Sequence, residues 1–344
     1  MNEIIFFGLN LFPKLFKNKQ NSIKKSIQFK FENENEKQIK QISSGYFSTI
    51  FLFKNGKAIE YLNENNSNEN PSKIQIEENI QKVSVGFENE AILTKEGNNN
   101  SRYCFWIFNL LINFKSKCLW NWFKSYGQLG FDSETLKKTE KPILMMKNVS
   151  KIFSGNCSDC VFLLNSNQEL FGCGFNYHGQ VGLGESRKEE KIQKLTKIQN
   201  IPKGKIIDIQ CGFNHSIMLI EEDQNENPKR KLYSCGDYIF NGLDKNEDDT
   251  YEFTEIKSSL FENDNILDFS VGHSHTLILT SNSKLIGFGS NRYGQLRTED
   301  TNDKSIPIQI ELPKLRFNED ISNYHISCGY NKSFLYYSPF FFQS

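Results

Sequence analysis

The sequence predicts an all-β fold, a closed β-propeller of about six four-stranded blades, with seven blades as the alternative. Three observations carry this prediction. Short apolar runs recur around glycines along the chain, two nearly identical turns lie in its second half, and the two ends match complementary halves of one repeat. Repeats of this length indicate a solenoid, a propeller or an array, and short strands favour the propeller.

The first repeated element is an apolar residue three positions before a glycine, with an apolar run five to seven positions after it. Its glycines are Gly45, Gly86, Gly155, Gly212, Gly272 and Gly329. They lie 41, 69, 57, 60 and 57 residues apart. The runs are short and rich in Ile, Val, Leu and Phe, which favours strands over helices. We expect each glycine at a tight reversal that needs a positive φ or leaves no room for a Cβ.

The second repeated element is a Gly-x-Asn-x-x-Gly-Gln turn. Its two clear copies contain Gly174, Gly179 and Gln180, and Gly289, Gly294 and Gln295. We expect a second pair of strands around this turn, as in residues 169–171 leading into Gly174. Each repeat is then one small antiparallel sheet of about four strands, which must stack on its neighbours to bury both faces.

The two ends of the chain are expected to share a blade. Residues 3–10 match the second half of a repeat, and residues 326–335 match the first half. Pairing of the N-terminal strand with the last blade would close the ring and remove exposed strand edges. The other five blades are expected at about 40–63, 80–130, 149–184, 206–243 and 266–297.

Five segments resemble the repeats of the regulator of chromosome condensation. Residues 212–216 and 272–276 resemble its Gly-x-x-His-Ser motif, and residues 126–130, 174–182 and 289–296 resemble its Gly-x-Asn-x-x-Gly-Gln-Leu-Gly motif. The resemblance covers nearly the whole chain, although other copies are divergent. It implies a propeller, which is seven-bladed in the best-known members. The founding member acts on the small GTPase Ran, so the resemblance also implies nucleotide exchange as a candidate activity.

The segment around residues 98–117 interrupts the repeat pattern and accounts for the 69-residue spacing. Its apolar run, residues 103–114, is 12 residues long, too short to cross a bilayer, which takes about 20. We therefore expect a single propeller domain over residues 1–344 with an atypical insertion at about 98–117. The insertion either packs as an extra helix or hangs off its blade, and it is either native or translated from an unspliced intron.

Charge gives no global preference for a partner class. The chain has 41 basic and 41 acidic residues, so no net field draws it to nucleic acid or to a membrane. Locally, residues 14–40 hold eight lysines and three glutamates, whereas residues 221–257 hold eleven acids and five bases. Both stretches fit solvated loops, and the acidic one, at 225–249, also fits a protein-binding loop.

Neither the cysteines nor the histidines form a recognisable reactive site. Cys157 and Cys160 form a Cys-x-x-Cys pair without the second pair that a structural zinc site needs, so no metal or cofactor is expected. His215 and His275 occupy the same place in two repeats, which favours a structural role. His178 and His273 are interpreted as isolated turn residues. No catalytic triad, carboxylate pair or phosphate loop is evident, so no enzyme is expected.

The sequence therefore predicts a protein-protein interaction propeller, a scaffold or binding module. The alternative is a guanine nucleotide exchange factor for a small GTPase, although no residues matching the nucleotide-displacing wedge can be identified. The start of the chain lacks a basic region before its apolar run, so we expect a cytoplasmic or nuclear protein. We expect it to be monomeric, without direct nucleic-acid or membrane binding.

Overall fold

The computed structural model describes most of the second half of the chain and shorter stretches of the first. The described residues are 4–9, 22–28, 38–45, 48–62, 73–76, 80–85, 90–94, 109–112, 117–121, 143–155, 158–186, 188–222, 228–243, 248–312 and 320–338. The fold is all-β, and the one helix in these ranges is the 3-10 turn η2 (Ile321–Asn323). No described helix is long and apolar enough to cross a membrane.

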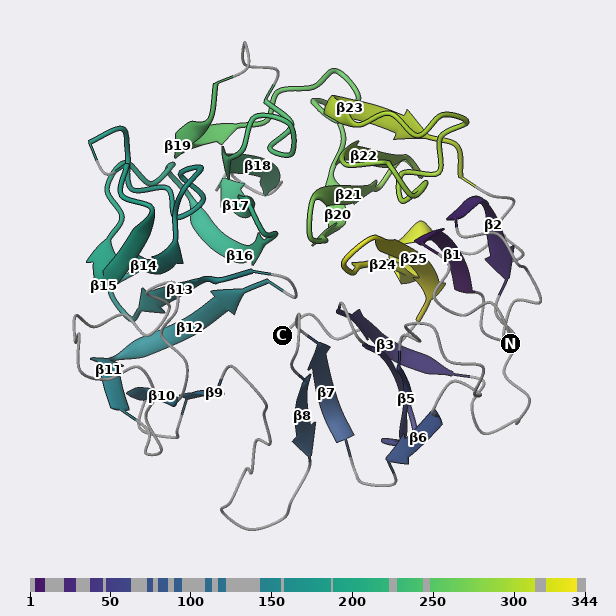
Figure 1. Ribbon diagram of the computed structural model, residues 1–344, viewed down its shortest axis with the longest axis horizontal. Helices are drawn as coiled ribbons and strands as arrows, with labels where there is room; N and C mark the ends of the chain where they lie inside the picture. The colour runs from purple at the N-terminus through teal and green to yellow at the C-terminus, as the bar shows by residue number, and fades with distance from the viewer. Residues whose placement is uncertain are drawn as a thin grey trace.

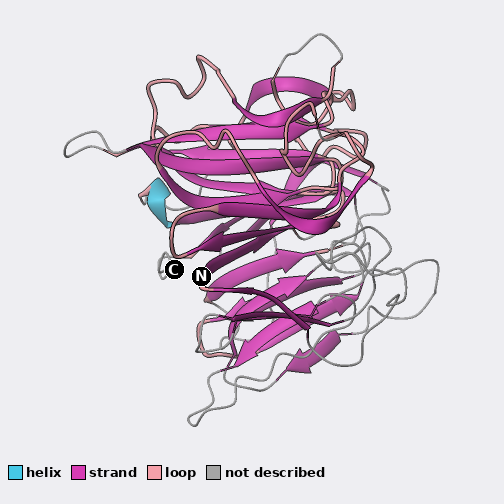
Figure 2. Ribbon diagram, turned by 90° about the vertical axis from the view of Figure 1, so that its left-hand side faces the viewer, coloured by secondary structure: helices cyan, strands magenta, loops and turns pink. Residues whose placement is uncertain are grey.

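The described residues form five four-stranded antiparallel sheets, which are arranged around a common centre (Figure 1). Four of them are built from consecutive strands: β3–β6, β12–β15, β16–β19 and β20–β23. The fifth has the strand order β2-β1-β25-β24. Seen from the side, their strands lie in stacked layers (Figure 2). This is the propeller-like arrangement that the short apolar runs predict.

The strands are short, and many of them lie in the apolar runs that flank the repeated glycines. The first part of the chain forms β1 (Ile4–Leu9), β2 (Ser22–Gln28), β3 (Ile39–Ser44), β4 (Ser48–Phe53), β5 (Ala58–Leu62), β6 (Lys73–Ile76), β7 (Ile80–Val85), β8 (Glu90–Thr94), β9 (Asn109–Ile112), β10 (Lys117–Asn121) and β11 (Ile143–Lys147). The next two sheets comprise β12 (Val149–Ser154), β13 (Cys160–Asn165), β14 (Leu170–Phe175), β15 (Lys191–Lys197), β16 (Lys205–Cys211), β17 (His215–Glu222), β18 (Lys229–Gly236) and β19 (Thr250–Glu255). The last strands are β20 (Ile266–Val271), β21 (His275–Thr280), β22 (Leu285–Gly289), β23 (Lys304–Ile310), β24 (Tyr324–Cys328) and β25 (Lys332–Tyr337).

The N-terminal strand pairs with the last strand of the chain, as the matching half-repeats predict. Strand β1 lies between β2 and β25, with Ile5 opposite Leu335 and Phe6 opposite Phe334. The Phe6 ring is fully buried, with its centroid 5.1 Å from that of Phe334. The two ends of the chain therefore share one sheet.

Apolar side chains fill the space between neighbouring sheets. Successive side chains of a strand point to opposite faces of its sheet, so each central strand contributes side chains to the packing against both neighbouring sheets. In β17, Met218 and Ile220 pack toward the β12–β15 sheet, whereas Ile217 and Leu219 pack toward the β20–β23 sheet. The one-residue alternation explains why these runs are apolar throughout rather than at every second position.

Glutamine side chains that hydrogen-bond to backbone groups of the next sheet also join neighbouring sheets near the centre. The Gln210 side chain on β16 donates to Phe269 O at 3.1 Å and accepts from Val271 N at 3.1 Å, both on β20. Gln41 on β3 does the same to both backbone groups of Val83 on β7, at 2.9 and 3.1 Å. A carboxamide carries N–H donors and a carbonyl acceptor side by side, so it pairs with the backbone of a strand edge as another strand would.

The predicted blade at 80–130 is not one four-stranded sheet. Strands β7 and β8 form a two-stranded sheet, and β9, β10 and β11 form a separate three-stranded one. Within the predicted insertion, Asn109–Ile112 forms β9, a strand rather than a helix, with Leu111 opposite Leu119 of β10. An apolar run beside an unpaired strand edge can form inter-strand backbone hydrogen bonds, whereas a short helix leaves the backbone groups at its ends unpaired. Gly86 and the turn at 126–130 lie outside the described residues.

Candidate functional site

The first-element glycines lie where neighbouring sheets converge. A Cβ on Gly155 would lie 1.5 Å from Cys211 O, and one on Gly272 would lie 2.5 Å from Gly329 O. A Cβ on Gly212 would lie 2.8 Å from Gly272 O. None of these glycines has a φ in the left-handed region. Of the two reasons expected from the sequence, crowding by the next sheet is therefore the one that applies here.

The equivalent turns share one hydrogen bond, from the glycine N–H to the carbonyl oxygen three residues later. It measures 2.8 Å from Gly212 to His215 and 2.8 Å from Gly272 to His275. Gly45 and Gly329 make the same bond at 2.9 Å. At Gly212, Gly272 and Gly329 these turns fix the positions of the residues that directly follow the glycine.

The two repeated histidines bridge neighbouring sheets. His275 Nε2 lies 2.9 Å from Ser333 Oγ, whose hydroxyl donates to Gln295 O at 2.9 Å. His215 Nε2 lies 3.1 Å from Thr276 Oγ1 of the next sheet. In the last sheet a buried lysine, Lys332, stands at the histidine position and donates to Thr49 Oγ1 at 3.2 Å. The sequence places these residues in register but does not show that their partners are hydroxyls of the next sheet.

Buried histidines should make the fold sensitive to acid. Burial, with a smaller contribution from neighbouring histidines, lowers the pKa of His215 and of His275 from 6.5 to about 3. The folded chain keeps both rings neutral while the unfolded chain protonates them. The free energy of unfolding therefore has its full value above pH 6.5. It falls between pH 6.5 and about 3, by up to about 1.4 kcal/mol per pH unit for each ring.

Urea unfolding at several pH values measures this slope. His275→Gln should make the loss of stability below pH 6.5 shallower than in the wild type, whatever its effect at neutral pH. Equal slopes for the variant and the wild type would contradict burial of a neutral His275.

The second-element glycines have the left-handed backbone that the turn prediction requires. Gly174 has a φ of +119° and Gly289 a φ of +97°. A Cβ at Gly174 would also lie 2.1 Å from Asp159 O, and one at Gly289 would lie 2.4 Å from Ser274 O. Gly174→Val and Gly289→Val should each lower the free energy of unfolding by roughly 1–3 kcal/mol. Wild-type thermal melts for both variants would contradict the turn assignment.

Asparagine and glutamine side chains hold each second-element turn. Val181 N donates to Asn176 Oδ1 at 3.0 Å, and Leu296 N donates to Asn291 Oδ1 at 2.9 Å. Gln180 accepts from His178 N at 3.0 Å and donates to Phe213 O at 3.1 Å. Gln295 accepts from Tyr293 N at 2.9 Å. Gln180 therefore ties the β14–β15 connection to the first-element turn of the next sheet.

These turns and connections form one end of the sheets, which we call the loop face. It comprises the turns 212–214, 272–274 and 329–331 and the connections β14–β15, β18–β19 and β22–β23. Backbone bonds join the two groups: Asp237 N donates to Asn214 O at 2.9 Å, and Ser290 N donates to Ser274 O at 2.6 Å. The hairpins β13–β14, β17–β18 and β21–β22 lie at the opposite end of the strands.

A continuous row of rings crosses the loop face. We call it the aromatic ladder, and it comprises Tyr177, Phe175, Phe213, His273 and Tyr330. The centroid distances between successive rings are 6.5, 5.8, 4.8 and 4.3 Å. Tyr177 is 60% exposed and the other four rings are half-buried. The ladder spans four sheets, and burial lowers the pKa of His273 to about 4, so its ring is neutral.

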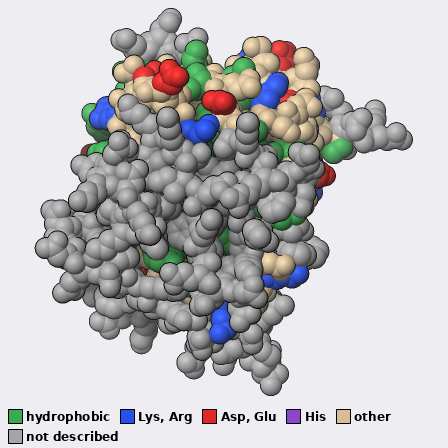
Figure 3. All heavy atoms as spheres, turned by 90° about the vertical axis from the view of Figure 1, so that its right-hand side faces the viewer, with side chains coloured by type: hydrophobic (Ala, Val, Ile, Leu, Met, Phe, Trp, Pro, Cys, Tyr) green, Lys and Arg blue, Asp and Glu red, His purple; other side chains and the backbone are tan. Residues whose placement is uncertain are grey.

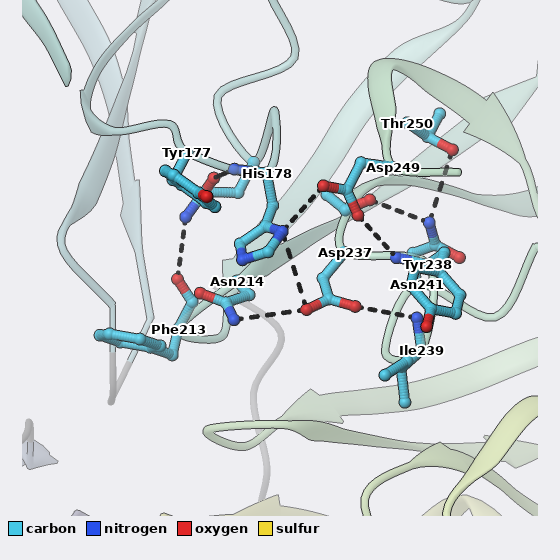
Figure 4. A network of polar contacts seen from close by, with 12 residues as sticks. Tyr177, His178, Phe213, Asn214, Asp237, Tyr238, Ile239, Asn241, Asp249 and Thr250 are labelled. Carbon is cyan, nitrogen blue, oxygen red and sulfur yellow. Dashed lines mark hydrogen bonds and ion pairs between the residues drawn. The ribbon is translucent and has the colours of Figure 1, made fainter. Parts of the chain in front are cut away.

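A polar network beside the ladder joins two sheets (Figure 4). His178 Nδ1 lies 2.8 Å from Asp249 Oδ2 and 3.8 Å from Asp237 Oδ2. Asn214 Nδ2 donates to Asp237 Oδ2 at 3.4 Å, and Tyr238 N donates to Asp249 Oδ1 at 3.2 Å. Burial raises the pKa of Asp237. The interpretation of His178 and His273 as isolated turn residues was wrong, because one belongs to this network and the other to the ladder.

The described cysteines are consistent with packing residues. Cys160, Cys173, Cys211, Cys235 and Cys328 are free and buried. Burial raises the pKa of the Cys235 thiol and raises that of Cys328 to about 12, so both are protonated at neutral pH. Within the described ranges, no group of three His, Cys, Asp or Glu side chains could hold a metal ion. Cys157 lies outside those ranges.

Comparison with protein families finds two matching segments. Residues 167–219 and residues 266–295 each match a model of the regulator of chromosome condensation (RCC1) repeat. Both contain a first-element turn, at Gly212 or at Gly272, and a Gly-x-Asn-x-x-Gly-Gln turn, at 174–180 or at 289–295.

Curated relatives match about half of the chain. The ultraviolet-B receptor UVR8 of Arabidopsis thaliana is 26% identical over 47% of this chain and 33% of its own length. The probable E3 ubiquitin-protein ligase HERC6 of Homo sapiens is 27% identical over 58% of this chain and 19% of its own length. The chain therefore spans a third or less of the length of these two relatives.

Solved structures match nearly the whole chain in fold. Human WBSCR16 superposes with a TM-score of 0.73 at 15% identity, covering 99% of this chain and 100% of WBSCR16. Yeast RCC1 (Prp20), in its complex with Kap60, superposes with a TM-score of 0.72 at 17% identity, covering 98% of this chain and 89% of Prp20. At these identities the likeness establishes the fold alone.

Proposed function

Because the chain belongs to the regulator of chromosome condensation repeat family, we propose that it is a protein-binding propeller that engages its partner through the loop face. The aromatic ladder is the observation that carries this proposal. Five rings lie in one row, four on turns that hydrogen bonds fix in place and Phe175 at the end of β14, and all keep some exposed surface. Pre-positioned aromatic side chains lose little conformational freedom on binding, which is why they dominate many protein interfaces.

The proposal includes a complete ring of six blades in one domain. The innermost strands β12, β16, β20, β24, β3 and β7 contact one another in that order, and the β1–β25 pair supports closure at the chain ends. The sixth blade would be built from β7 to β11 and would carry the insertion at 98–117, while seven blades would result if β9–β11 stood alone. We further propose a monomeric, non-catalytic protein of the cytoplasm or nucleus that binds no nucleic acid directly.

Quantitative affinity purification tests the role of the face. Tagged wild type is compared with Phe213→Ala, which removes a central ladder ring, and with Ile306→Ala, a 43% exposed apolar residue on the outer strand β23. We expect Phe213→Ala to lose the partners that Ile306→Ala and the wild type retain. Thermal melts serve as the control that all three proteins are folded. Equal recovery by both variants would contradict binding through this face.

Guanine nucleotide exchange is the alternative function within the same fold. Prp20p of Saccharomyces cerevisiae, whose binding to Gsp1p and histones has been described, superposes with a TM-score of 0.72 at 16% identity. An exchange factor must bind the nucleotide-free GTPase in preference to the loaded form. Pull-downs against nucleotide-free and GTP-loaded small GTPases separate the two functions. Recovery of the empty form would favour exchange, and recovery of neither form would exclude it.

A further inference from the structure

The loop face carries most of its charge as carboxylates. The described parts of the β14–β15, β18–β19 and β22–β23 connections are 176–186 with 188–190, 237–243 with 248–249, and 290–303. They hold three acidic residues each, nine in all, against one, none and two basic residues, three in all. The formal charge of these connections is therefore −6, in a chain balanced at 41 acidic and 41 basic residues.

Three of these nine carboxylates pair with cations of the same face: Glu185 with Lys188 at 2.5 Å, Asp303 with Arg292 at 3.4 Å, and Asp300 with Lys304 of β23 at 2.8 Å. On the edge of the molecule shown in Figure 3, acidic and basic side chains of the described residues occur side by side. At the opposite end of the strands, Lys231 neutralises Glu222 at 3.0 Å, and Arg230 pairs with Glu221 at 3.2 Å. A surface of one sign attracts partners of the other sign and repels partners of its own.

A lysine of the chain itself already lies beside an aromatic ring and a carboxylate of the loop face. Lys188 Nζ lies 4.6 Å from the centre of the Tyr251 ring and 2.5 Å from Glu185 Oε2. The Tyr251 hydroxyl in turn reaches Tyr177 O, 3.5 Å away, at the end of the aromatic ladder. Aromatic faces attract ammonium and guanidinium groups, and a carboxylate beside the ring supplies the counter-charge. One lysine is thus already bound in the way that an incoming lysine or arginine could be.

Rings and carboxylates continue from this point along the ladder. Tyr177 is 60% exposed, Asp248 is exposed, and the half-buried Asp249 lies beside His178, whose ring contacts Tyr177 with centroids 4.9 Å apart. Phe213 follows on the next turn.

We propose that the loop face binds a lysine- and arginine-rich segment of a protein partner, with cationic side chains over the exposed Tyr177 ring and near the exposed Asp248 carboxylate. This inference rests on the proposed function and adds the chemistry of the partner. Nucleic acid is disfavoured even though its bases could stack on the ladder, because the phosphates would meet a formal charge of −6.

Fluorescence anisotropy with short labelled probes tests the proposal. The probes are a Lys/Arg-rich peptide, a peptide of the same length with glutamate at each basic position, and a single-stranded oligonucleotide. We expect the basic peptide to bind, with an affinity that falls as salt is raised, and the other two probes to bind much more weakly. Equal or tighter binding of the glutamate peptide or of the oligonucleotide would overturn the proposal.

Matched variants locate the binding. Tyr177→Ala and Asp248→Asn should each weaken binding of the basic peptide about fivefold, the fold-change that corresponds to about 1 kcal/mol. Ile306→Ala and Glu222→Gln, which change an outer strand and the opposite end of the sheets, should bind as the wild type does. Uniform binding by all four variants would overturn the proposal, because the peptide would then be held elsewhere.

The two proposals can fail separately. If Phe213→Ala loses natural partners in affinity purification but the basic peptide does not bind the wild type, the loop face binds proteins of another chemistry. If the face variants neither lose partners nor affect the peptide, both the function and the partner chemistry are wrong.

Discussion

Deletion of residues 1–10 is expected to leave the chain largely unfolded at room temperature. The deletion removes β1 from between β2 and β25, and with it the ladder hydrogen bonds on both sides. It also removes Phe6, which is fully buried with Phe51 and Phe334 in the core between two sheets. Loss of one buried phenylalanine costs about 3–5 kcal/mol, and typical domains have only about 5–15 kcal/mol of stability.

Circular dichroism and thermal melts measure this effect. Deletion of residues 1–3, which ends just before β1, is the matched control and should melt close to the full-length protein. Phe6→Ala should fall between the two. A 1–10 deletion that melts like the control would show that β1 is dispensable and that the chain ends do not complete a blade.

Gly155→Val is expected to be the most damaging single substitution among the repeat glycines. An added Cβ would lie 1.5 Å from Cys211 O and 2.4 Å from Cys211 C, both backbone atoms that no rotamer change can move. The sheets β12–β15 and β16–β19 would have to separate and give up packing at their shared core. Overpacking of this kind costs about 1–3 kcal/mol and sometimes more, and here we expect at least about 3 kcal/mol.

Gly184→Ala separates crowding from backbone strain. Gly184 has a φ of +94°, but the nearest atom to an added Cβ is a side-chain oxygen of Glu252 at 3.1 Å. We expect that variant to lose only about 1–2 kcal/mol from the left-handed backbone. Urea unfolding of Gly155→Val, Gly155→Ala and Gly184→Ala compares the three. If both Gly155 variants were as stable as Gly184→Ala, the close approach of the two sheets would be refuted.

The sequence predicts the repeated elements well because each depends on local chemistry. Neighbouring residues are enough to recognise each of them: the glycines that precede residues 215 and 275, the Gly-x-Asn-x-x-Gly-Gln turns and the apolar central strands. The pairing of β1 with β25 is also foreseeable, since each end of the chain matches half of a repeat. The predicted blade at 80–130 is less predictable, because the segment expected to be an insertion contains an apolar strand, β9, that pairs with the edge of β10.

The loop face depends on contacts between sheets, which a single sequence does not display. His178 and Asp249 are 71 residues apart in the chain, and nothing in either turn marks the other as a partner. The aromatic ladder did leave a signal: the residue directly after each first-element glycine is Phe213, His273 and Tyr330 in three successive repeats. A ring at the same position of successive repeats indicates a shared surface. Comparing the residue after each first-element glycine therefore predicts the aromatic ladder from the sequence.

Hydrogen–deuterium exchange of the chain, free and with a captured partner, tests binding through the loop face most directly. The account predicts that partner binding protects residues 176–186, 212–214, 272–274 and 329–331, and leaves the opposite hairpins at 165–170 and 280–285 unchanged. Protection confined to those hairpins, with no change at the first-element turns, would contradict it.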